Sequence, residues 1–538
     1  MNKYGSHRLS LILLIGIFAL ICWMRIPYIS VPVLIVDEAL YSEIANTILD
    51  GGLPYKDAWE QKPPGIYYLY AVVFALLGRN NLIAIHWMAC LAVIFTSLGL
   101  YLLGKNIHTE KTGVVAALFY GILSGAGSAS HFQAANTEIF SMFWAVWAVV
   151  VYVIYGKKKW GLLSSGALVA VSFLFKQPGG LLLIVIALTE FGASSQTFKV
   201  YIRQIIRVIY GLAIVIIAVI LFFWLKGGIY DLWMVGFWHN IVYMKGNSLL
   251  HGLRVAWKNI PFQIRGNYFF YLTGMIVFIG HGVTVVRRKI FCQFDEKKRQ
   301  RYILFLGWFC TGWISVGLGW RFEGHYFFFV LPVIALLSAF FCVYLGAYLY
   351  RSINKVTIRI AVFSVFILIC MGGIGYSLAV HSSGAFRLRR TYKVLIDADN
   401  AQGESIRQVA RYIHNNTKAM DTVFVWGFCP QIYTLSDRRC ASRFVFCNFL
   451  IGQMTGDEYF FNNTERLDRV IPGAWNYLIE DLLQKFPVYI VDTSPSNYFQ
   501  YGNYPARRFK ELRSFLNSFY TFETRIINMD VYRLDSSK

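Results

Sequence analysis

The run VIYGLAIVIIAVILFFWL, Val208–Leu225, contains no charged side chain, while Arg207 and Lys226 flank it directly. A helix of about 20 apolar residues spans the hydrocarbon core of a bilayer, because in lipid a helix satisfies its backbone hydrogen bonds internally. The run therefore predicts a transmembrane helix whose two flanking cations lie at the membrane surfaces.

The whole chain shares this character. Of its 538 residues, 57% are hydrophobic and 15% are charged, and the mean hydropathy is +0.49. Soluble chains average about 45–50% apolar and about 25% charged residues. A chain this apolar cannot bury its nonpolar surface in its own cores. The composition excludes a string of soluble domains and indicates a polytopic α-helical membrane protein.

Similar apolar runs recur along the first 380 residues, separated by short polar breaks. Their lengths predict about eleven transmembrane helices. These lie near Leu9–Met24, Leu82–Leu103, Gly113–Ala129, Thr137–Tyr155, Gly161–Phe175, Pro178–Phe191, Val208–Leu225, Tyr268–Val286, Tyr302–Trp320, Tyr326–Leu349 and Ile360–Val380. The apolar segment Ile66–Leu77 is too short to span, which favours an interfacial or re-entrant helix.

The basic residues indicate how these helices are oriented. The chain has 51 Lys and Arg against 29 Asp and Glu, a formal charge of +22, which in a soluble protein would suggest a nucleic-acid partner. Here the excess gathers in every second break, at Lys105/Lys111, Lys157–Lys159, Lys199/Arg203/Arg207, Arg287–Arg301 and Arg351/Lys355/Arg359. Cytoplasmic loops carry such an excess. We therefore expect a cytoplasmic N-terminus, an outer C-terminus and no nucleic-acid partner.

The predicted domain organisation has two parts. Residues 1–380 form the transmembrane domain, whose first outer loop spans residues 25–81. Residues 381–538 carry helical patterns at Ser405–Asn415 and Phe509–Phe519 among short strand-like runs. This alternation predicts a C-terminal extracytoplasmic α/β domain, whose motifs are too generic to assign it a ligand.

Cysteine and histidine spacing does not indicate a metal centre. Six of the nine cysteines lie in or beside predicted spans, where cysteine serves as a small apolar residue. The other three, Cys429, Cys440 and Cys447, lie in the C-terminal domain and permit one disulfide at most, with no preference among the pairs. Because the sequence has no Cys-x-x-Cys pair or His-rich spacing, we expect no metal and no other cofactor.

The first outer loop contains two adjacent carboxylates, Asp37 and Glu38, shortly after an apolar helix. Adjacent residues of a helix point about 100° apart, so one can face a cavity while neighbours hold the other. A partly desolvated carboxylate at the membrane edge is suited to take a proton from a hydroxyl or an amine. The alternative is that Asp37 is the N-cap of the helix that follows.

Lys62 follows in the same loop, directly before Pro63 and Pro64. The two prolines stiffen the backbone and fix the direction in which the amine projects. A preorganised ammonium group at the membrane surface is suited to bind phosphate. The alternative is that Lys62 extends toward the lipid headgroups.

Further ionisable residues lie at the outer ends of predicted spans, a position that tends to be functional. They are Glu138, Lys176, Arg321, Glu323 and His325, with Tyr326 beside the last. Several have a purely structural alternative. Glu138 could interact favourably with the dipole at the start of its helix, and Lys176 could extend toward the lipid headgroups. Arg321 and Glu323 could form an ion pair with each other. Residues 226–267 add aromatic and basic residues that fit either a lid or an interfacial aromatic belt, namely Trp233, Trp238, His239, Tyr243, Lys245 and His251.

The order of these motifs resembles a known family. Asp37-Glu38, then Gly51-Gly-Leu-Pro-Tyr55, then Lys62-Pro-Pro-Gly-Ile-Tyr-Tyr68 is similar to the first periplasmic loop of polyprenyl-phosphate-dependent glycosyltransferases with the GT-C fold. The nearest group is the superfamily of protein O-mannosyltransferases and aminoarabinose lipid A transferases, in particular its bacterial mannosyltransferase-like or galacturonosyltransferase-like members. The likeness covers about the first 350 residues.

The resemblance implies roles for particular residues. Asp37 corresponds to the catalytic carboxylate, with Glu38 as its companion, and Glu138 stands where relatives often have a second catalytic Asp. Lys62 corresponds to the lysine that contacts the donor phosphate, and relatives also place a lysine at the position of Lys176. Arg321, His325 and Tyr326 lie in a segment that is aromatic-rich in relatives and together are suited to hold a lipid-linked phosphate.

The implied activity is an inverting transfer of a sugar from a polyprenyl-phosphate donor to an envelope acceptor. The acceptor is a glycolipid, lipopolysaccharide, a cell-wall polymer or a protein, on the outer side of the bacterial cytoplasmic (inner) membrane. The partners are then the lipid-linked donor, the acceptor and the bilayer. The alternative is a transporter or flippase of lipid-linked sugars, which should show inverted repeats and ionisable residues near the middle of the membrane. Neither feature is evident in the sequence.

Overall fold

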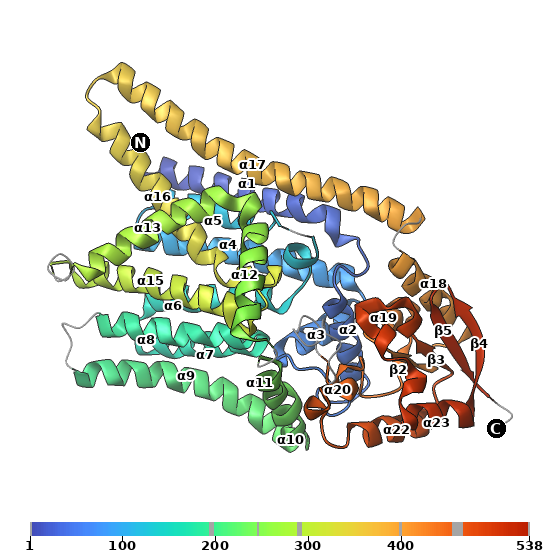
Figure 1. The fold of residues 1–538 in the computed structure, drawn as a ribbon. Helices are drawn as coiled ribbons and strands as arrows, with labels where there is room; N and C mark the ends of the chain where they lie inside the picture. Colours follow the sequence, from blue (N-terminus) through green and yellow to red (C-terminus); the bar gives the residue numbers. More distant parts are fainter. Residues whose placement is uncertain are drawn as a thin grey trace.

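The computed structural model describes residues 3–127, 129–192, 198–244, 247–287, 293–397, 401–453 and 466–535. Long helices lie side by side in a bundle, and a smaller domain of strands and short helices packs against one end of it (Figure 1). Two short helices that follow the first long helix lie at the junction of the two parts. Residues from both parts therefore meet at this end of the bundle.

The helices of the bundle follow the apolar runs of the sequence. They are α1 (Lys3–Ile29), α2 (Val36–Leu49), α3 (Gly65–Leu77), α4 (Leu82–Ile107), α5 (Glu110–Leu123), α6 (Thr137–Tyr155), α7 (Lys159–Phe175), α8 (Leu182–Gly192), α9 (Phe198–Leu225), α10 (Ile229–Asp231), α11 (His239–Met244), α12 (Leu249–Ile264), α13 (Tyr268–Val286), α15 (Glu296–Gly317), α16 (Leu331–Ser352) and α17 (Val356–Asp397). Short 3₁₀ or π segments form several of the breaks, at Ala129–Gln133, Gln177–Leu181, Leu232–Trp238, Leu318–Trp320 and Gly324–Phe329.

Eight helical segments among the described residues are long and apolar enough to cross a membrane. They are His7–Ile29, Leu82–Ile107, Thr137–Tyr155, Phe198–Leu225, Leu249–Val286, Glu296–Trp320, Leu331–Ser352 and Val356–Ser382. Three further predicted spans correspond to shorter helices, with 14 residues in α5, 17 in α7 and 11 in α8. At 1.5 Å per residue, α5 is about 21 Å long, less than the ~30 Å of a bilayer core. The predicted number of about eleven spans is therefore not confirmed.

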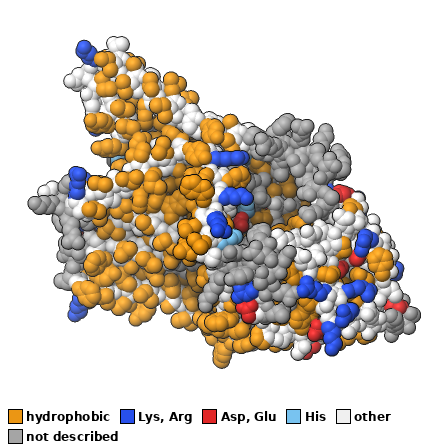
Figure 2. Space-filling view, viewed as in Figure 1, with side chains coloured by type: hydrophobic (Ala, Val, Ile, Leu, Met, Phe, Trp, Pro, Cys, Tyr) orange, Lys and Arg blue, Asp and Glu red, His pale blue; other side chains and the backbone are white. Residues whose placement is uncertain are grey.

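The surface of the bundle is apolar. Ile217 on α9 and Leu368 on α17 are 60% and 66% exposed, and many neighbours on both helices are similarly exposed hydrophobic residues. Hydrophobic side chains cover the bundle in Figure 2, where Lys and Arg lie at the helix ends farthest from the C-terminal domain, in the central hollow and over the C-terminal domain. A continuous apolar surface of this kind requires lipid rather than water around it.

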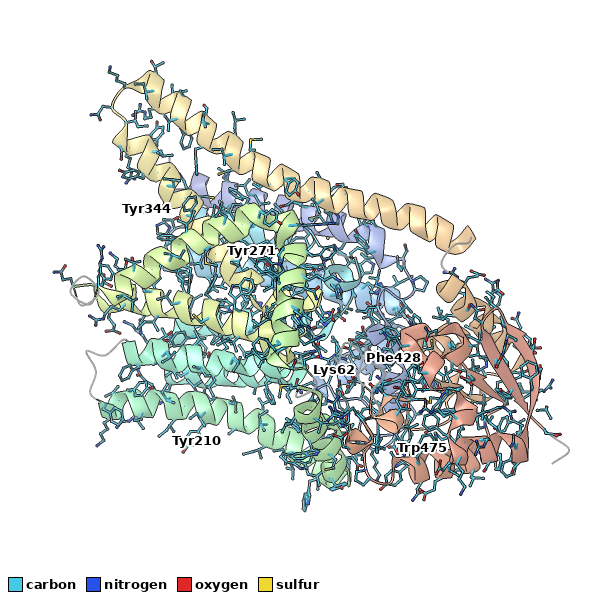
Figure 3. The ribbon with its side chains drawn as sticks, viewed as in Figure 1. Lys62, Tyr210, Tyr271, Tyr344, Phe428 and Trp475 are labelled. Atoms are coloured by element: carbon cyan, nitrogen blue, oxygen red, sulfur yellow. The ribbon has the colours of Figure 1, made fainter. Side chains whose placement is uncertain are left out.

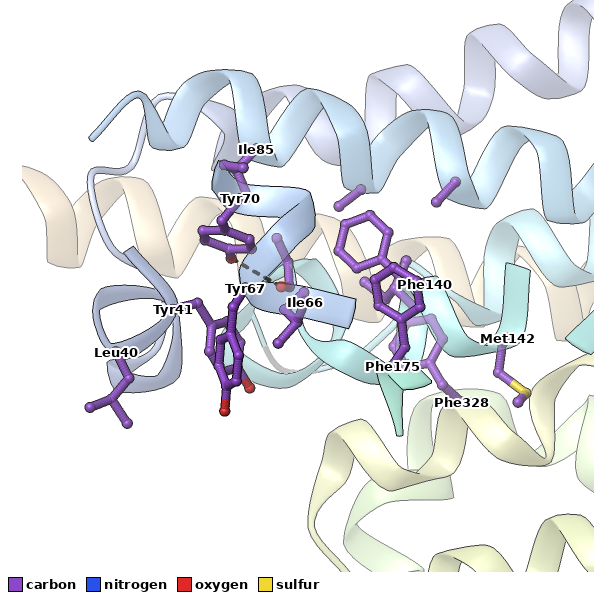
Figure 4. Packing of buried hydrophobic residues seen from close by; sticks show 14 of the residues in the cluster. Leu40, Tyr41, Ile66, Tyr67, Tyr70, Ile85, Phe140, Met142, Phe175 and Phe328 are labelled. Atoms are coloured by element: carbon purple, nitrogen blue, oxygen red, sulfur yellow. Dashed lines mark hydrogen bonds between the residues drawn. The ribbon is translucent and has the colours of Figure 1, made fainter. Parts of the chain in front are cut away.

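Tyrosines pack at the junction (Figure 4). The ring of Tyr41 on α2 lies 6.0 Å from that of Tyr67 and 5.5 Å from that of Tyr70, both on α3, and all three side chains are fully buried. The Tyr70 hydroxyl donates a hydrogen bond of 3.1 Å to the carbonyl of Ala135, in the segment before α6. Because a buried hydroxyl needs a partner, this bond favours one position of α3. The packing holds α2 at the edge of the bundle.

The C-terminal domain is an α/β fold, as the sequence predicts. Its five-stranded sheet has the order β2-β1-β3-β5-β4. Strands β2, β1 and β3 are parallel to one another, and β5 runs antiparallel to both of its neighbours, β3 and β4. The strands are β1 (Thr422–Trp426), β2 (Arg439–Cys440), β3 (Tyr489–Asp492), β4 (Tyr520–Ile526) and β5 (Met529–Leu534). The helices are α18 (Ala401–Asn416), α19 (Gln431–Ser436), α20 (Asn448–Ile451), α22 (Ala474–Lys485) and α23 (Lys510–Phe519). The predicted domain limit between residues 380 and 381 falls inside α17.

This domain is joined to the first outer loop by backbone and charged contacts. The Trp59 amide donates to the Arg443 carbonyl at 2.7 Å, and the Cys440 amide donates to the Glu43 carboxylate at the same distance. Arg439 forms an ion pair of 3.1 Å with Asp50. The loop therefore has a defined position against the domain. The three cysteines of the C-terminal domain, Cys429, Cys440 and Cys447, are buried free thiols, without a disulfide among them.

Candidate active site

A cavity of about 740 Å³ lies where the bundle meets the C-terminal domain. In Figure 3, Lys62 from the first outer loop and Phe428 from the C-terminal domain lie close together at this junction, and both line the cavity. Charged side chains are visible in the corresponding hollow of Figure 2. Six of the eight residues that the sequence singles out as catalytic or phosphate-binding line the cavity: Asp37, Lys62, Lys176, Arg321, His325 and Tyr326. Glu38 and Glu138 lie outside its lining.

Asp37 lies in the first turn of α2, on the side that faces the cavity. The helix begins at Val36 and its N-cap is Ile35, so Asp37 is not the cap. Its carboxylate forms an ion pair of 3.2 Å with Lys62 and accepts a hydrogen bond of 3.3 Å from the Tyr41 hydroxyl. Burial alone would raise the pKa of Asp37, but the positive charges of Lys62 and Lys176 outweigh burial and hold this pKa below its usual value.

Glu38 points away from the cavity and is fully buried. Its carboxylate accepts hydrogen bonds from the backbone amides of Leu34 (2.7 Å) and Ala135 (2.8 Å), and one of its oxygens lies 3.0 Å from Nε2 of His86. These contacts tie the start of α2 to α4 and to the segment before α6. The geometry makes Glu38 a residue that orients its neighbour, Asp37, across the first turn.

Replacing Glu38 by Ala is expected to lower the free energy of unfolding by about 3–5 kcal/mol, because it leaves buried donors without their charged acceptor. The midpoint of thermal unfolding in detergent measures this. Replacing the exposed Glu511 by Ala is the control and should leave the midpoint unchanged. An unfolding midpoint of the Glu38 variant equal to that of the wild type would show that the carboxylate does not hold α2 in place.

Lys62 is held between two carboxylates. Besides Asp37, its ammonium nitrogen lies 3.1 Å from Glu60 and 5.2 Å from the centre of the Tyr41 ring. Glu60 is itself buried and accepts hydrogen bonds from the Tyr67 hydroxyl and, at 2.7 Å, from the Lys62 amide. Pro63 and Pro64 then lead into α3. These contacts direct the amine toward the cavity and away from the lipid surface.

Glu138 and Lys176 form a second ion pair beside the cavity, with 3.0 Å between Nζ and Oε1. Glu138 is in the first turn of α6 and is buried, and Lys176 is the residue between α7 and the 3₁₀ turn at Gln177–Leu181. The ammonium group of Lys176 also lies 5.1 Å from the centre of the Tyr326 ring. Glu138 thus holds the ammonium group of Lys176 beside the cavity.

A break between α15 and α16 contributes Arg321, Glu323 and His325. Three residues here have left-handed backbone angles: Gly319 (φ 73°), Trp320 (φ 58°) and Phe322 (φ 49°). Non-glycine residues adopt this conformation only where the surroundings impose it. The break turns the side chains of Arg321, Glu323 and His325 toward the cavity. Arg321 and His325 are largely buried there, 3% and 8% exposed.

His131 also lines the cavity, although no sequence pattern marks it. It lies in the π turn at Ala129–Gln133, and its Nδ1 is 3.0 Å from Nδ1 of His325. A Cβ atom at Gly324 would come within 2.8 Å of the His131 ring, so the close approach of the two rings requires glycine there. Burial lowers the pKa of both histidines, to about 4 for His325. Neutral imidazoles can share one proton between facing nitrogens, which fits this contact.

Part of the segment 226–267 lies at the cavity. Asn240 and Met244 on α11 line the cavity, and the Asn240 amide donates to the carbonyl of Gln61. Trp233 and Trp238 are about half exposed, whereas His239 is buried. Lys245 and the side chain of Tyr243 lie outside the described residues. Within the described ranges, no three His, Cys, Asp or Glu side chains are grouped to hold a metal ion.

Comparisons with known proteins agree with the resemblance seen in the first loop. Residues 61–224 match the family of dolichyl-phosphate-mannose-protein mannosyltransferases. This stretch contains Lys62, His131, Glu138 and Lys176. No curated protein matches the sequence.

Solved structures show the same overall fold. The chain is similar to the oligosaccharyltransferase AglB of Archaeoglobus fulgidus in complex with an inhibitory peptide and a dolichol-phosphate, with a TM-score of 0.57 and 11% identity over 100% of this chain and 75% of that one. It is also similar to ArnT of Cupriavidus metallidurans bound to undecaprenyl phosphate, with a TM-score of 0.56 and 14% identity over 100% and 99%. Both have the GT-C fold. The chain is therefore a multi-pass membrane protein of the GT-C fold, as its sequence predicts.

Proposed function

We propose that this chain is an inverting glycosyltransferase that moves a sugar from a polyprenyl-phosphate donor to an envelope acceptor. One observation carries the proposal: a carboxylate, Asp37, faces a cavity that it shares with the cations Lys62, Lys176 and Arg321. A transfer of this kind needs a base for the acceptor and positive charge for the leaving phosphate, close together and shielded from water. The family match and the GT-C fold support the same chemistry.

The cations have the task of stabilising the leaving phosphate. As the bond between the anomeric carbon and the phosphate oxygen breaks, negative charge accumulates on the phosphate, and Lys62 and Arg321 neutralise it. Lys176, held by Glu138, adds positive charge from the side of Tyr326. The neutral His325 can donate a hydrogen bond to a phosphate oxygen.

Asp37 has the task of the general base. It orients the acceptor nucleophile and removes its proton while the nucleophile attacks the anomeric carbon from the face opposite the phosphate, which inverts the anomer. The depressed pKa of Asp37 keeps the carboxylate ionised near neutral pH. The sequence predicts catalytic roles for Glu38 and Glu138 as well. In this mechanism Glu38 holds the turn that carries Asp37, and Glu138 orients Lys176.

We place the protein in the bacterial cytoplasmic membrane with the cavity and the C-terminal domain on the outer side. Basic loops at the helix ends remote from that domain support this orientation. Residues 1–380 then form the catalytic transmembrane domain and residues 381–538 the extracytoplasmic domain. A sugar transferred from a lipid carrier at this surface becomes part of the cell envelope.

The test uses full-length purified protein and undecaprenyl-phosphate sugars, with release of undecaprenyl phosphate as the measurement. Transfer or release from at least one of several such donors, mannosyl and galacturonosyl among them, is the expected result. A transporter would instead move the lipid-linked sugar across a liposome bilayer without cleaving it. Flux without cleavage would therefore contradict the proposal.

The pH dependence of transfer should identify the base. Because the pKa of Asp37 lies below the usual value near 4 for a carboxyl group, the rate should stay constant from pH 7 down to about pH 5 and fall only in more acidic solution. Initial rates in detergent between pH 4 and pH 8 measure this. An acidic limb near pH 6.5 would indicate a histidine in place of Asp37.

A further inference from the structure

Charge is divided unequally between the two sides of the cavity. Among the residues that the structure describes, the ionisable ones that line it come from the bundle and the first loop, from Asp37 to Tyr326. The described part of the C-terminal domain contributes three phenylalanines and three amides, which we call the amide–aromatic wall: Phe428, Phe446, Asn448, Asn497, Phe499 and Gln500. The ionisable lining residues and the amide–aromatic wall therefore come from different parts of the chain.

We propose that the amide–aromatic wall is an acceptor subsite that binds an uncharged saccharide. This inference rests on the proposed glycosyl transfer and names the class of acceptor. Sugar rings present apolar C–H faces and a ring of hydroxyl groups. Aromatic side chains pack against the first, and amides donate and accept hydrogen bonds with the second.

The phenylalanines form a fixed cluster. The ring of Phe428 lies 5.1 Å from that of Phe446 and 4.8 Å from that of Phe499, both in edge-to-face contact. Phe446 packs in turn against Phe449 at 5.2 Å. Phe428 and Phe446 are largely buried although they line the cavity. An apolar surface held in this way is already ordered before a ligand binds, so little entropy is lost on binding.

Two of the amides are oriented by bonds that use their oxygens. The Asn448 oxygen accepts a hydrogen bond of 2.7 Å from the Tyr501 hydroxyl, and the Asn497 oxygen accepts one of 3.0 Å from the Gly502 amide. In both cases the NH₂ group of a cavity-lining side chain remains as a donor. Because these amide donors are uncharged, they are suited to donate hydrogen bonds to the hydroxyl oxygens of a sugar.

The backbone that carries half of the wall is strained. Asn497, Phe499 and Gln500 have φ angles of 51°, 48° and 59°, in the left-handed region that bulky residues avoid. Asparagine tolerates this conformation, but phenylalanine and glutamine do not favour it. Such strain persists where the surroundings impose it and is concentrated at binding sites. Here it accompanies the placement of the Phe499 ring against Phe428.

The position of the wall favours the acceptor over the donor lipid. The cations that suit the donor phosphate come from the bundle and the first loop, whereas the wall comes from the C-terminal domain. The isoprenoid chain of the donor belongs beside the apolar helices of the bundle. An acceptor must approach from the side away from the phosphate. A carboxylated or amino sugar would bring an unpaired charge against the wall, which disfavours it.

The test measures binding of three octyl glycosides with the same chain and ring but different charge: neutral octyl glucoside, octyl glucuronide with a carboxylate at C6, and octyl glucosaminide with an amine at C2. Affinities are measured with the full-length protein in nanodiscs that contain undecaprenyl phosphate. We expect the neutral probe to bind about tenfold more tightly than either charged probe. Gln500→Lys should reverse the order in favour of the glucuronide. Gln484→Lys, at an exposed position of α22, is the matched control and should leave the order unchanged.

Two results with the probes would overturn the proposed acceptor subsite: equal affinities for all three probes, or no change in their order in Gln500→Lys. Weaker binding of undecaprenyl phosphate in Phe499→Leu would also overturn it, since this would place the carrier lipid at the wall. Folding of each variant is checked by its unfolding midpoint. Failure of the proposed function is a separate result, because it appears as a lack of undecaprenyl phosphate release, whatever the order of the probes.

Discussion

The Asp37→Asn variant is expected to transfer sugar about three orders of magnitude more slowly than the wild type, at saturating donor and acceptor. The amide has the shape of the carboxylate but cannot take a proton from the nucleophile. It also removes the negative charge that would stabilise the nucleophile as it becomes positive. The loss should therefore appear in kcat, with little change in the KM for the donor.

The contacts of Asp37 sharpen this expectation. In the wild type its carboxylate shares the Lys62 ammonium group with Glu60. Loss of one of the two carboxylates leaves Lys62 more available to a phosphate, so the affinity for undecaprenyl phosphate should be unchanged or higher. A variant that loses both turnover and donor binding would instead indicate a disrupted first loop.

The matched control is Asp50→Asn, at the other end of α2. Asp50 is exposed and forms ion pairs with Arg79 and Arg439, but it does not line the cavity. This variant should transfer at the wild-type rate. Turnover of Asp37→Asn within tenfold of the wild type would rule out Asp37 as the base.

The sequence predicts which motifs belong to the site better than it predicts their geometry. Asp37 and Glu38 are adjacent, and the pattern alone cannot show which one faces the cavity. That depends on where α2 begins, and the start at Val36 turns Asp37 toward Lys62 and Glu38 toward His86. The residue at which α2 begins, and so the face that each side chain takes, depends on contacts with distant parts of the chain. The segment before α6, for example, supplies one of the contacts of Glu38.

Two groups of cavity residues could not be predicted. His131 approaches His325 across 194 positions of sequence, and no local pattern marks such a contact. The amide–aromatic wall comes from short turns of the C-terminal domain, where Asn497 and Phe499 resemble ordinary loop residues. Only the observed left-handed backbone distinguishes them.

The number of spans is the part of the fold that hydropathy alone leaves open. The apolar run Gly113–Ala129 reads as one span, but α5 ends at Leu123. Glycines at positions 121, 125 and 127 follow closely in this run, and Gly125 and Gly127 pack against Met24 and Phe132. Pro178 similarly begins a 3₁₀ turn before α8. Buried short helices are as apolar as spans, so composition cannot separate them.

Lys62→Ala is expected to weaken binding of undecaprenyl phosphate about 10- to 100-fold, the contribution of a charge-assisted hydrogen bond. The loss should lie at the upper end of this range for an electrostatic reason. Without the ammonium group, Asp37 and Glu60 face the cavity uncompensated and repel the phosphate. Equilibrium binding in detergent at low ionic strength measures the effect.

The same variant should change the pH profile in a direction that distinguishes phosphate binding from mere support of the loop. The charge of Lys62 is a main cause of the depressed pKa of Asp37, against burial, which raises it. With Lys62 removed, burial dominates, the pKa rises, and the acidic limb of the residual activity moves to higher pH. The control, Lys56→Ala, removes an exposed lysine of the same loop outside the cavity lining and should alter neither property. Unchanged donor affinity in Lys62→Ala would contradict phosphate binding by Lys62, and an unmoved acidic limb would contradict its coupling to Asp37.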